Sequence, residues 1–209
     1  EAGAAVTTGV QNTLIGGLAG DALTTGLNNV AVGVRALGAD TLGFNSVAIG
    51  TDALRTQNFT SATATYNVAV GSDAGREVTT GTQNTLIGGL AGDAITTASN
   101  NTAVGYASFS ANTTGTANVA VGKDALLANT TGSSNVAVGM DALTANTTAA
   151  NNTAVGGNAL KANTTGAQNT AVGGRSQEAT STGSDNTSIG WGSLILNTTG
   201  TSNTALGRS

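Results

Sequence analysis

The sequence contains no histidine, no cysteine and no proline, and the first two absences exclude whole classes of site. Without histidine there can be no Ser-His-Asp triad and no histidine-ligated zinc. Without cysteine there can be no disulfide framework and no thiolate metal site. No apolar run reaches the roughly 18 residues of a membrane-spanning helix. We therefore expect no membrane span and no cofactor.

Aromatic and charged residues are also scarce. Aromatic residues make up 3% and charged residues 9% of the 209 positions, and the net charge is −4. Large side chains supply most of a globular core, so a conventional core would be poor here. The seven Lys and Arg residues form no basic cluster, which excludes nucleic acid as an expected partner. What the chain has instead is abundant Gly, Ala, Val, Thr and Asn in a regular order.

A five-residue motif, Asn-(Thr/Val)-Ala-(Val/Ile)-Gly or a close variant, recurs twelve times along the chain. Successive motifs begin 17 residues apart, except for an interval of 21 between Ser46 and Asn67, which puts a four-residue insertion within 55–66. From residue 101 the unit reads nearly as NTAVGxxALxANTTGxx. We number the places of this unit 1 to 17 from its leading Asn. A unit this short cannot bury its own apolar face, so the units must stack.

The repeat predicts an all-β fold: a single domain, 1–209, forming a parallel β-solenoid or β-roll of twelve coils of roughly 17 residues. The motif alternates, so its second and fourth places face the same way. The fourth place is always aliphatic and mostly β-branched, as expected of a buried strand position, so we predict that it faces inward. The Gly at place 5 predicts a positive φ or a tight corner.

A second apolar position and a turn complete the unit. Place 9 is a second apolar position, occupied by Leu37, Leu54, Phe109, Leu126, Leu143, Leu160 and Leu194. The Asn-Thr-Thr-Gly segment supplies turn chemistry. Helix is the competing interpretation of the Asp-Ala-Leu segments, but frequent Gly makes a helix of more than a turn or two unfavourable.

Two columns of asparagine are predicted to form ladders, because stacked amides can hydrogen-bond along the stack. A polar face that contacts carbohydrate is the alternative interpretation. The second column is Asn112, Asn129, Asn146, Asn163 and Asn197. The first column, interrupted by Ser46, is Asn12, Asn29, Asn67, Asn84, Asn101, Asn118, Asn135, Asn152, Asn169, Asn186 and Asn203.

Three aromatic residues are candidate ligand contacts. Phe59 and Tyr66 lie in or beside the insertion, and an irregular loop on a regular stem is where a binding loop would be placed. Trp191 follows a Gly and could stack on a sugar ring or on a neighbouring chain. A longer turn without a ligand is the simpler interpretation of the insertion.

Carboxylates recur at place 7 in four units. Asp residues in adjacent coils would lie about one strand spacing apart, so a column of calcium sites is conceivable. We favour the simpler interpretation of solvated turn carboxylates and expect no metal. The four residues are Asp52, Asp73, Asp124 and Asp141.

The segment Asn45–Gly50 reads NSVAIG, which resembles the head repeats of trimeric autotransporter adhesins. The longer pattern NTAVGxxALxxNTTG is similar to repeats in bacteriophage tail fibres. The resemblance covers essentially the whole chain and implies a homotrimeric left-handed β-roll or similar fibre that displays a binding surface. The adhesin repeat is commonly shorter, so the turn after Asn-Thr-Thr-Gly is longer here.

These observations favour a non-enzymatic structural or adhesive fibre. The expectation is a bacteriophage tail fibre or similar appendage, extracellular on a virion or cell surface, that attaches to a glycan or protein receptor on a host. The alternatives are a bacterial adhesin head, a self-stacking filament subunit and an ice-binding solenoid. The adjacent Thr113 and Thr114 count against ice binding, because neighbouring residues of a strand point oppositely.

Assembly is the last expectation. A coil of 17 residues encloses little core, so we expect columns of Ala and Leu to remain exposed for lateral burial, which favours a homotrimer over a solitary solenoid. Residues 1–11 fill places 7 to 17 and residues 203–209 fill places 1 to 7, so both ends fall within a unit. Exposed strand edges invite strand addition, so we expect end-to-end contact with more fibre or with copies of the chain.

Overall fold

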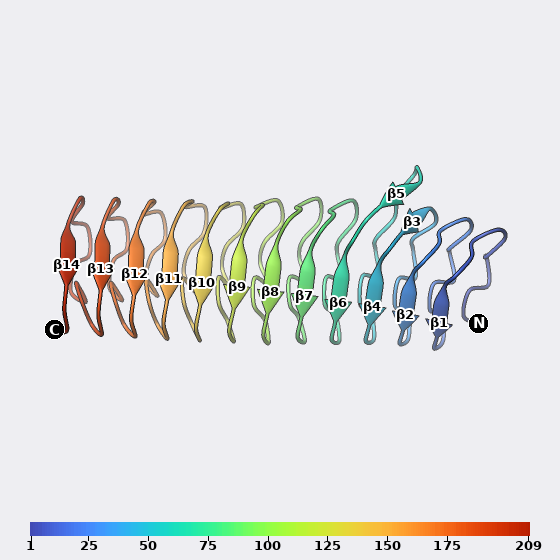
Figure 1. The fold of residues 1–209 in the computed structure, drawn as a ribbon, viewed down its shortest axis with the longest axis horizontal. Coiled ribbons are helices and arrows are strands. Elements are labelled where there is room, and N and C mark those ends of the chain that lie inside the picture. Colours follow the sequence, from blue (N-terminus) through green and yellow to red (C-terminus); the bar gives the residue numbers. More distant parts are fainter.

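The computed structural model describes all 209 residues and forms a straight, all-β solenoid in which each coil stacks on the one before it (Figure 1). No helix is present that could cross a membrane. Twelve strands, one per unit, form a single parallel sheet, which confirms the predicted parallel β-solenoid. They are β1 (Thr13–Ile15), β2 (Val30–Val32), β4 (Val47–Ile49), β6 (Val68–Val70), β7 (Thr85–Ile87), β8 (Thr102–Val104), β9 (Val119–Val121), β10 (Val136–Val138), β11 (Thr153–Val155), β12 (Thr170–Val172), β13 (Thr187–Ile189) and β14 (Thr204–Leu206).

The register of this sheet repeats the unit without slippage. Val119 pairs with Val136 and Val121 with Val138, so each place lies opposite the same place of the next coil. Such stacking turns every place of the unit into a column that runs along the fibre, with a spacing of about 4.8 Å.

The four-residue insertion interrupts one coil and creates a small second sheet. This sheet pairs β3 (Gly43–Phe44) with β5 (Thr63–Ala64), and Gly43 lies opposite Thr63. Gly43 occupies place 15 of its unit and Thr63 is the 18th residue of the next, so three of the four extra residues precede Thr63 and one follows it, all within the predicted 55–66 segment. In Figure 1 the β5 segment rises out of the otherwise even row of coils.

The prediction that the fourth place faces inward is wrong. Ala120, at place 3, is fully buried, whereas Val119 and Val121 on either side of it are half-buried. At place 4, Ile189 is 44% exposed. The alternation was real, but the strand turns place 3 toward the interior, and the Val and Ile side chains stack on the outside. Place 3 is Ala in most coils, and where it is the fully buried Leu86, place 9 of the same unit is glycine.

Place 9 faces inward, so the expectation that columns of Ala and Leu stay exposed for lateral burial is wrong. Leu126, Leu143 and Leu160 are fully buried in successive coils, and Phe109 fills the same place in the coil before them. These side chains and the alanines of places 3 and 8 dominate a continuous core of 27 buried residues. Leu194 is half-buried.

The corner glycine has the positive φ that the sequence predicted. Gly122 has φ of 135°, and a Cβ atom built there would lie 2.6 Å from the carbonyl carbon of Gly139 in the next coil. Glycine is therefore required at place 5 for two reasons: φ is positive, and the backbones of two coils approach each other closely.

Left-handed backbone also occurs at residues that do not favour it. Asp124 at place 7, Leu126 at place 9 and Ala117 at place 17 have φ of 56°, 52° and 57°. This conformation costs a non-glycine residue roughly 1–2 kcal/mol. Hydrogen bonds to both neighbouring coils hold it in place. Asp124 N donates to the carbonyl of Tyr106 at 3.1 Å, and Leu126 N donates to that of Ala142 at 3.0 Å.

Candidate functional site

The leading asparagines form a ladder that ties each coil to itself and to the next. The Oδ1 atom of Asn118 accepts the backbone N–H of Asn135 at 2.9 Å. Its Nδ2 atom donates to the carbonyl of Gly132, 14 residues further on in the same coil, at 3.0 Å. Asn118 and Asn135 are buried. With these amides enclosed and hydrogen-bonded, the column does not present a polar face to carbohydrate.

The second asparagine column forms a shorter ladder. Asn129 donates to the Oδ1 atom of Asn112 at 3.1 Å, and the same bond joins Asn146 to Asn129 at 2.8 Å. Asn163 continues it to Asn146 at 3.0 Å. The next residue of the column is Thr180, and the buried Oδ1 atom of Asn163 is left without a hydrogen-bond partner.

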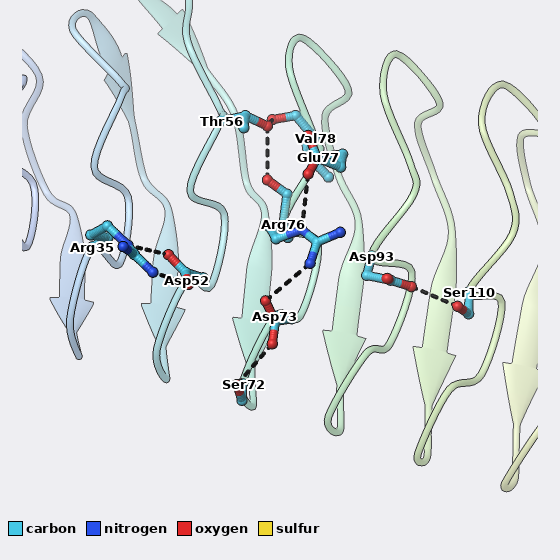
Figure 2. A network of polar contacts seen from close by, with 10 residues as sticks. All are labelled: Arg35, Asp52, Thr56, Ser72, Asp73, Arg76, Glu77, Val78, Asp93 and Ser110. Carbon is cyan, nitrogen blue, oxygen red and sulfur yellow. Dashed lines mark hydrogen bonds and ion pairs between the residues drawn. The ribbon is translucent and has the colours of Figure 1, made fainter.

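The carboxylates at place 7 are paired with cations of the same chain. Figure 2 shows Arg35 donating through Nε and Nη2 to both carboxylate oxygens of Asp52, at 2.7 and 2.6 Å. These hydrogen bonds lower the pKa of the Asp52 carboxyl. Arg76 lies 3.4 Å from Asp73 and 2.9 Å from Glu77. The other two pairs are Lys123–Asp124 and Lys161–Asp141.

The structure brings no three carboxylates together at this column or elsewhere. No group of three or more Asp or Glu side chains is placed to hold a metal ion. The column is therefore a line of surface ion pairs at one corner of the solenoid, and exposed pairs of this kind each contribute about 0–1 kcal/mol.

Charge is confined to one side of the coil. The chain has seven Lys and Arg and eleven Asp and Glu residues, and all but two of them occupy places 6 to 11. The exceptions are Asp40 at place 12, which is fully buried, and Asp185 at place 17. Places 12 to 17 and 1 to 5 therefore present two almost uncharged surfaces.

The first uncharged surface is the outward face of the twelve-stranded sheet, formed by places 2 and 4. We call it the sheet face. Every one of its side chains is Val, Thr, Ile or Leu. Ile15 is 59% exposed, Ile87 39% and Ile189 44%. The face measures about 55 Å by about 10 Å by strand geometry, which is at the upper end of the range for the largest apolar patch on a monomer.

The second uncharged surface is the turn that contains the two adjacent threonines. At place 13 the Thr113 hydroxyl donates to the carbonyl of Thr130 in the next coil at 3.2 Å, and this bond recurs along the stack. At place 14 Thr114 is exposed and its hydroxyl makes no hydrogen bond within the protein. We call the uninterrupted row of place-14 residues the threonine edge. It consists of Thr80, Thr97, Thr114, Thr131, Thr148, Thr165, Thr182 and Thr199.

The three candidate aromatic residues do not form one site. Phe59 is only 6% exposed, so its ring is not presented to a ligand. Tyr66 is 56% exposed beside the insertion. Trp191, 46% exposed, lies far along the fibre, with the guanidinium carbons of Arg175 and Arg208 at 5.7 and 5.2 Å from its ring centroid. These two cation–π contacts come from the coils on either side of Trp191.

A buried polar network at the insertion was missed by the sequence analysis. Gln57 Nε2 donates to Asp40 at 2.6 Å and to the Ser46 hydroxyl at 2.9 Å, and Gln57 Oε1 accepts from Asn67 Nδ2 at 2.8 Å. Ser46 and Thr65 share a hydrogen bond of 2.5 Å. Burial raises the pKa of the Asp40 carboxyl. A comparison of place 12 across the units could have indicated this network, because Asp40 and Gln57 occupy a place that is Asn or aliphatic in most other units.

A second polar cluster lies within the core near the C-terminal end, and it was also missed. Gln177 occupies place 9, where the other complete units have Leu, Phe or Gly, and is fully buried. Its Nε2 atom donates to the Ser188 hydroxyl at 3.1 Å, and its Oε1 atom has no partner. Ser188 also hydrogen-bonds Ser176.

The structure contains one pocket, at the C-terminal coil, and no groove along the faces. It is lined by Ser193, Leu194, Ala205, Leu206, Gly207, Arg208 and Ser209. These residues include no nucleophile paired with a base. No protein-family model, curated protein or solved structure matches this chain. Inference about function therefore rests on the surfaces described above.

Proposed function

We propose that this chain is a stretch of a non-enzymatic structural and adhesive fibre, carried outside the cell on a virion or cell surface. A bacteriophage tail fibre or similar appendage that attaches to a host cell is the form we favour. The observation that carries the proposal is the asparagine ladder, in which the Asn118–Asn135 hydrogen bond recurs from coil to coil along a straight stack. The insertion is the one irregular loop on this stack. A bacterial adhesin head is the alternative with the same architecture.

Lateral assembly into a homotrimer follows from the sheet face. An aliphatic surface of this length would be costly to leave in water, and at about 25 cal/mol per Å² its burial is a strong driving force for association. The charges of places 6 to 11 would remain outside. End-to-end contact with more fibre or with other copies would extend the same stack through the edges of β1 and β14.

The insertion is the proposed contact with a glycan or protein receptor. Phe59 anchors the loop from below: its side chain is buried and its N–H donates to Asp40 at 3.4 Å. Thr60 and Ser61 at the tip and the Tyr66 ring beside them are exposed. A loop held by a buried network loses little freedom on binding, which favours affinity.

Two variants with the same added charge test the assembly. Val138→Lys places a charge on the sheet face, and Thr144→Lys places one at place 10 of the same unit, where Lys161 lies one coil further on. We expect wild type and Thr144→Lys to be elongated trimers by light scattering and electron microscopy. We expect Val138→Lys to be a folded monomer. A monomeric wild type would refute the homotrimer, and a compact, non-elongated particle would refute the fibre.

Deleting residues 59–62 tests the receptor contact, because it restores the 17-residue spacing. The shortened chain should keep the elongated shape and lose adhesion to host cells. Adhesion equal to that of the full chain would remove the insertion from the proposal.

A further inference from the structure

We propose that the threonine edge binds ice. This goes beyond the fibre role and does not depend on trimerisation. The place-14 threonines occupy eight consecutive coils from Thr80 to Thr199, and each is exposed. Because the coils are in register, their hydroxyl and methyl groups repeat about every 4.8 Å along a straight line.

The sequence argument against ice binding was that adjacent threonines point in opposite directions. The structure shows that the two hydroxyls differ in their surroundings, and this favours the site. The Thr113 side chain turns along the stack, and its hydroxyl donates to the carbonyl of Thr130 at 3.2 Å. Thr114 turns outward and leaves its hydroxyl free for water. The inner threonines hold the backbone of the edge while the outer ones form its surface.

Place 16 forms a second column beside the edge, separated from it by a small buried residue such as Gly115 or Ala149. Its residues are Thr82, Ser99, Thr116, Ser133, Ala150, Ala167, Ser184 and Thr201, and most of them are half-buried. The Ser133 hydroxyl accepts the backbone N–H of Thr116 in the preceding coil at 3.0 Å, so this column holds the stack together. The outward hydroxyls of the edge therefore form one straight row with a repeat of about 4.8 Å.

Rigidity and neutrality both suit an ice lattice. Asn118 and Asn129 each donate to the carbonyl of Gly132, so both ladders hold the backbone of the edge. Asp185 is the only charged residue at places 13 to 17 from Thr79 onward. Charged side chains would hold their own hydration shells, whereas methyl and hydroxyl groups can order water into a lattice. The edge is less suited to binding a sugar, because the one pocket of the structure lies elsewhere and the edge has no aromatic residue.

The test is thermal hysteresis and inhibition of ice recrystallisation by the full chain. Wild type should depress the freezing point below the melting point and keep ice crystals small. The double variant Thr131→Lys, Thr148→Lys should lose most of both effects, because it places two charges in the centre of the edge. Thr144→Lys, on the charged side of the same unit as Thr148, should retain them.

Circular dichroism and the melting temperature separate loss of the surface from loss of the fold, and all three proteins should share the wild-type spectrum. Absence of any effect of folded wild type on ice would overturn the proposal. Equal activity of the double variant and wild type would move the ice-binding surface elsewhere and would also overturn it. Binding of a soluble glycan without any effect on ice would assign the edge to a different ligand.

Discussion

The Oδ1 atom of Asn118 accepts the backbone N–H of Asn135, one coil further along the fibre, at 2.9 Å. The same amide donates to the carbonyl of Gly132 at 3.0 Å and so closes its own coil. A single side chain thus fixes both the size of a coil and its register on the next. This explains why asparagine recurs at a fully buried position, where an unpaired amide would be costly.

Removing this amide should therefore destabilise the solenoid. Asn118→Ala leaves the buried N–H of Asn135 without its acceptor, at about 1–3 kcal/mol. The carbonyl of Gly132, by contrast, keeps the hydrogen bond from Asn129. We expect the free energy of unfolding to fall by about 1–3 kcal/mol in urea titrations. Thr131→Ala, which removes an exposed hydroxyl without a partner, should change it by less than about 0.5 kcal/mol. A similar loss in both variants would contradict the ladder's role.

The second ladder offers the opposite experiment, a gain of stability. Thr180→Asn would place an amide donor one coil beyond the unpaired Oδ1 atom of Asn163. The Thr180 hydroxyl now donates to the carbonyl of Asn197, at 2.9 Å. We expect a gain of about 1 kcal/mol in the free energy of unfolding, because a buried acceptor acquires its partner. A loss of stability would show that the new amide does not reach Asn163.

The repeat, the parallel stacking and the apolar character of place 9 could be predicted from the sequence. The choice of inward face at the strand could not. Alternation separates Ala120 from Val119 and Val121, but it does not say which side is the interior. That depends on the width of the coil, which is set by how Leu126 and Ala125 fill it. The available clue was that place 3 is Ala in nine of the twelve units.

The left-handed residues were hidden for a different reason. Leu126 has φ of 52° although leucine disfavours this region, so no local preference predicts the left-handed conformation. Hydrogen bonds to adjacent coils impose the conformation, and they exist only once the coils have stacked. The Asp40–Gln57 contact likewise joins residues 17 apart and is invisible within either unit alone.

Relief of this strain gives a third prediction. Ala117 has φ of 57° and is exposed, so its methyl group contributes little packing. Ala117→Gly should remove a strain of roughly 1–2 kcal/mol against an entropic cost of roughly 0.5–1 kcal/mol. We expect a small rise in melting temperature. Ala120→Gly, in a strand of ordinary φ, should lower it, and a fall in both variants would contradict the strain argument.

Two carboxylates should give the stability of the fibre opposite dependences on pH. Burial raises the pKa of Asp40 above its ordinary value of 3.8, although Gln57 donates a hydrogen bond to it. Its contribution to stability is therefore fully present below about pH 3.8 and is lost as the pH rises through the raised pKa. Hydrogen bonds from Arg35 lower the pKa of Asp52, so its contribution is present above that pH and is lost as the pH falls.

Variants of these two carboxylates separate the effects. Relative to Asp40→Asn, the free energy of unfolding of wild type should decline as the pH rises from about 3 to about 7, because only wild type then carries a buried charge. Relative to Asp52→Asn, it should increase over the same range, because only wild type then gains the ion pair with Arg35. Urea titrations at a series of pH values give both differences. If the free energy of unfolding of wild type minus that of Asp40→Asn stays constant or increases with pH, the site does not disfavour the charge of the Asp40 carboxyl.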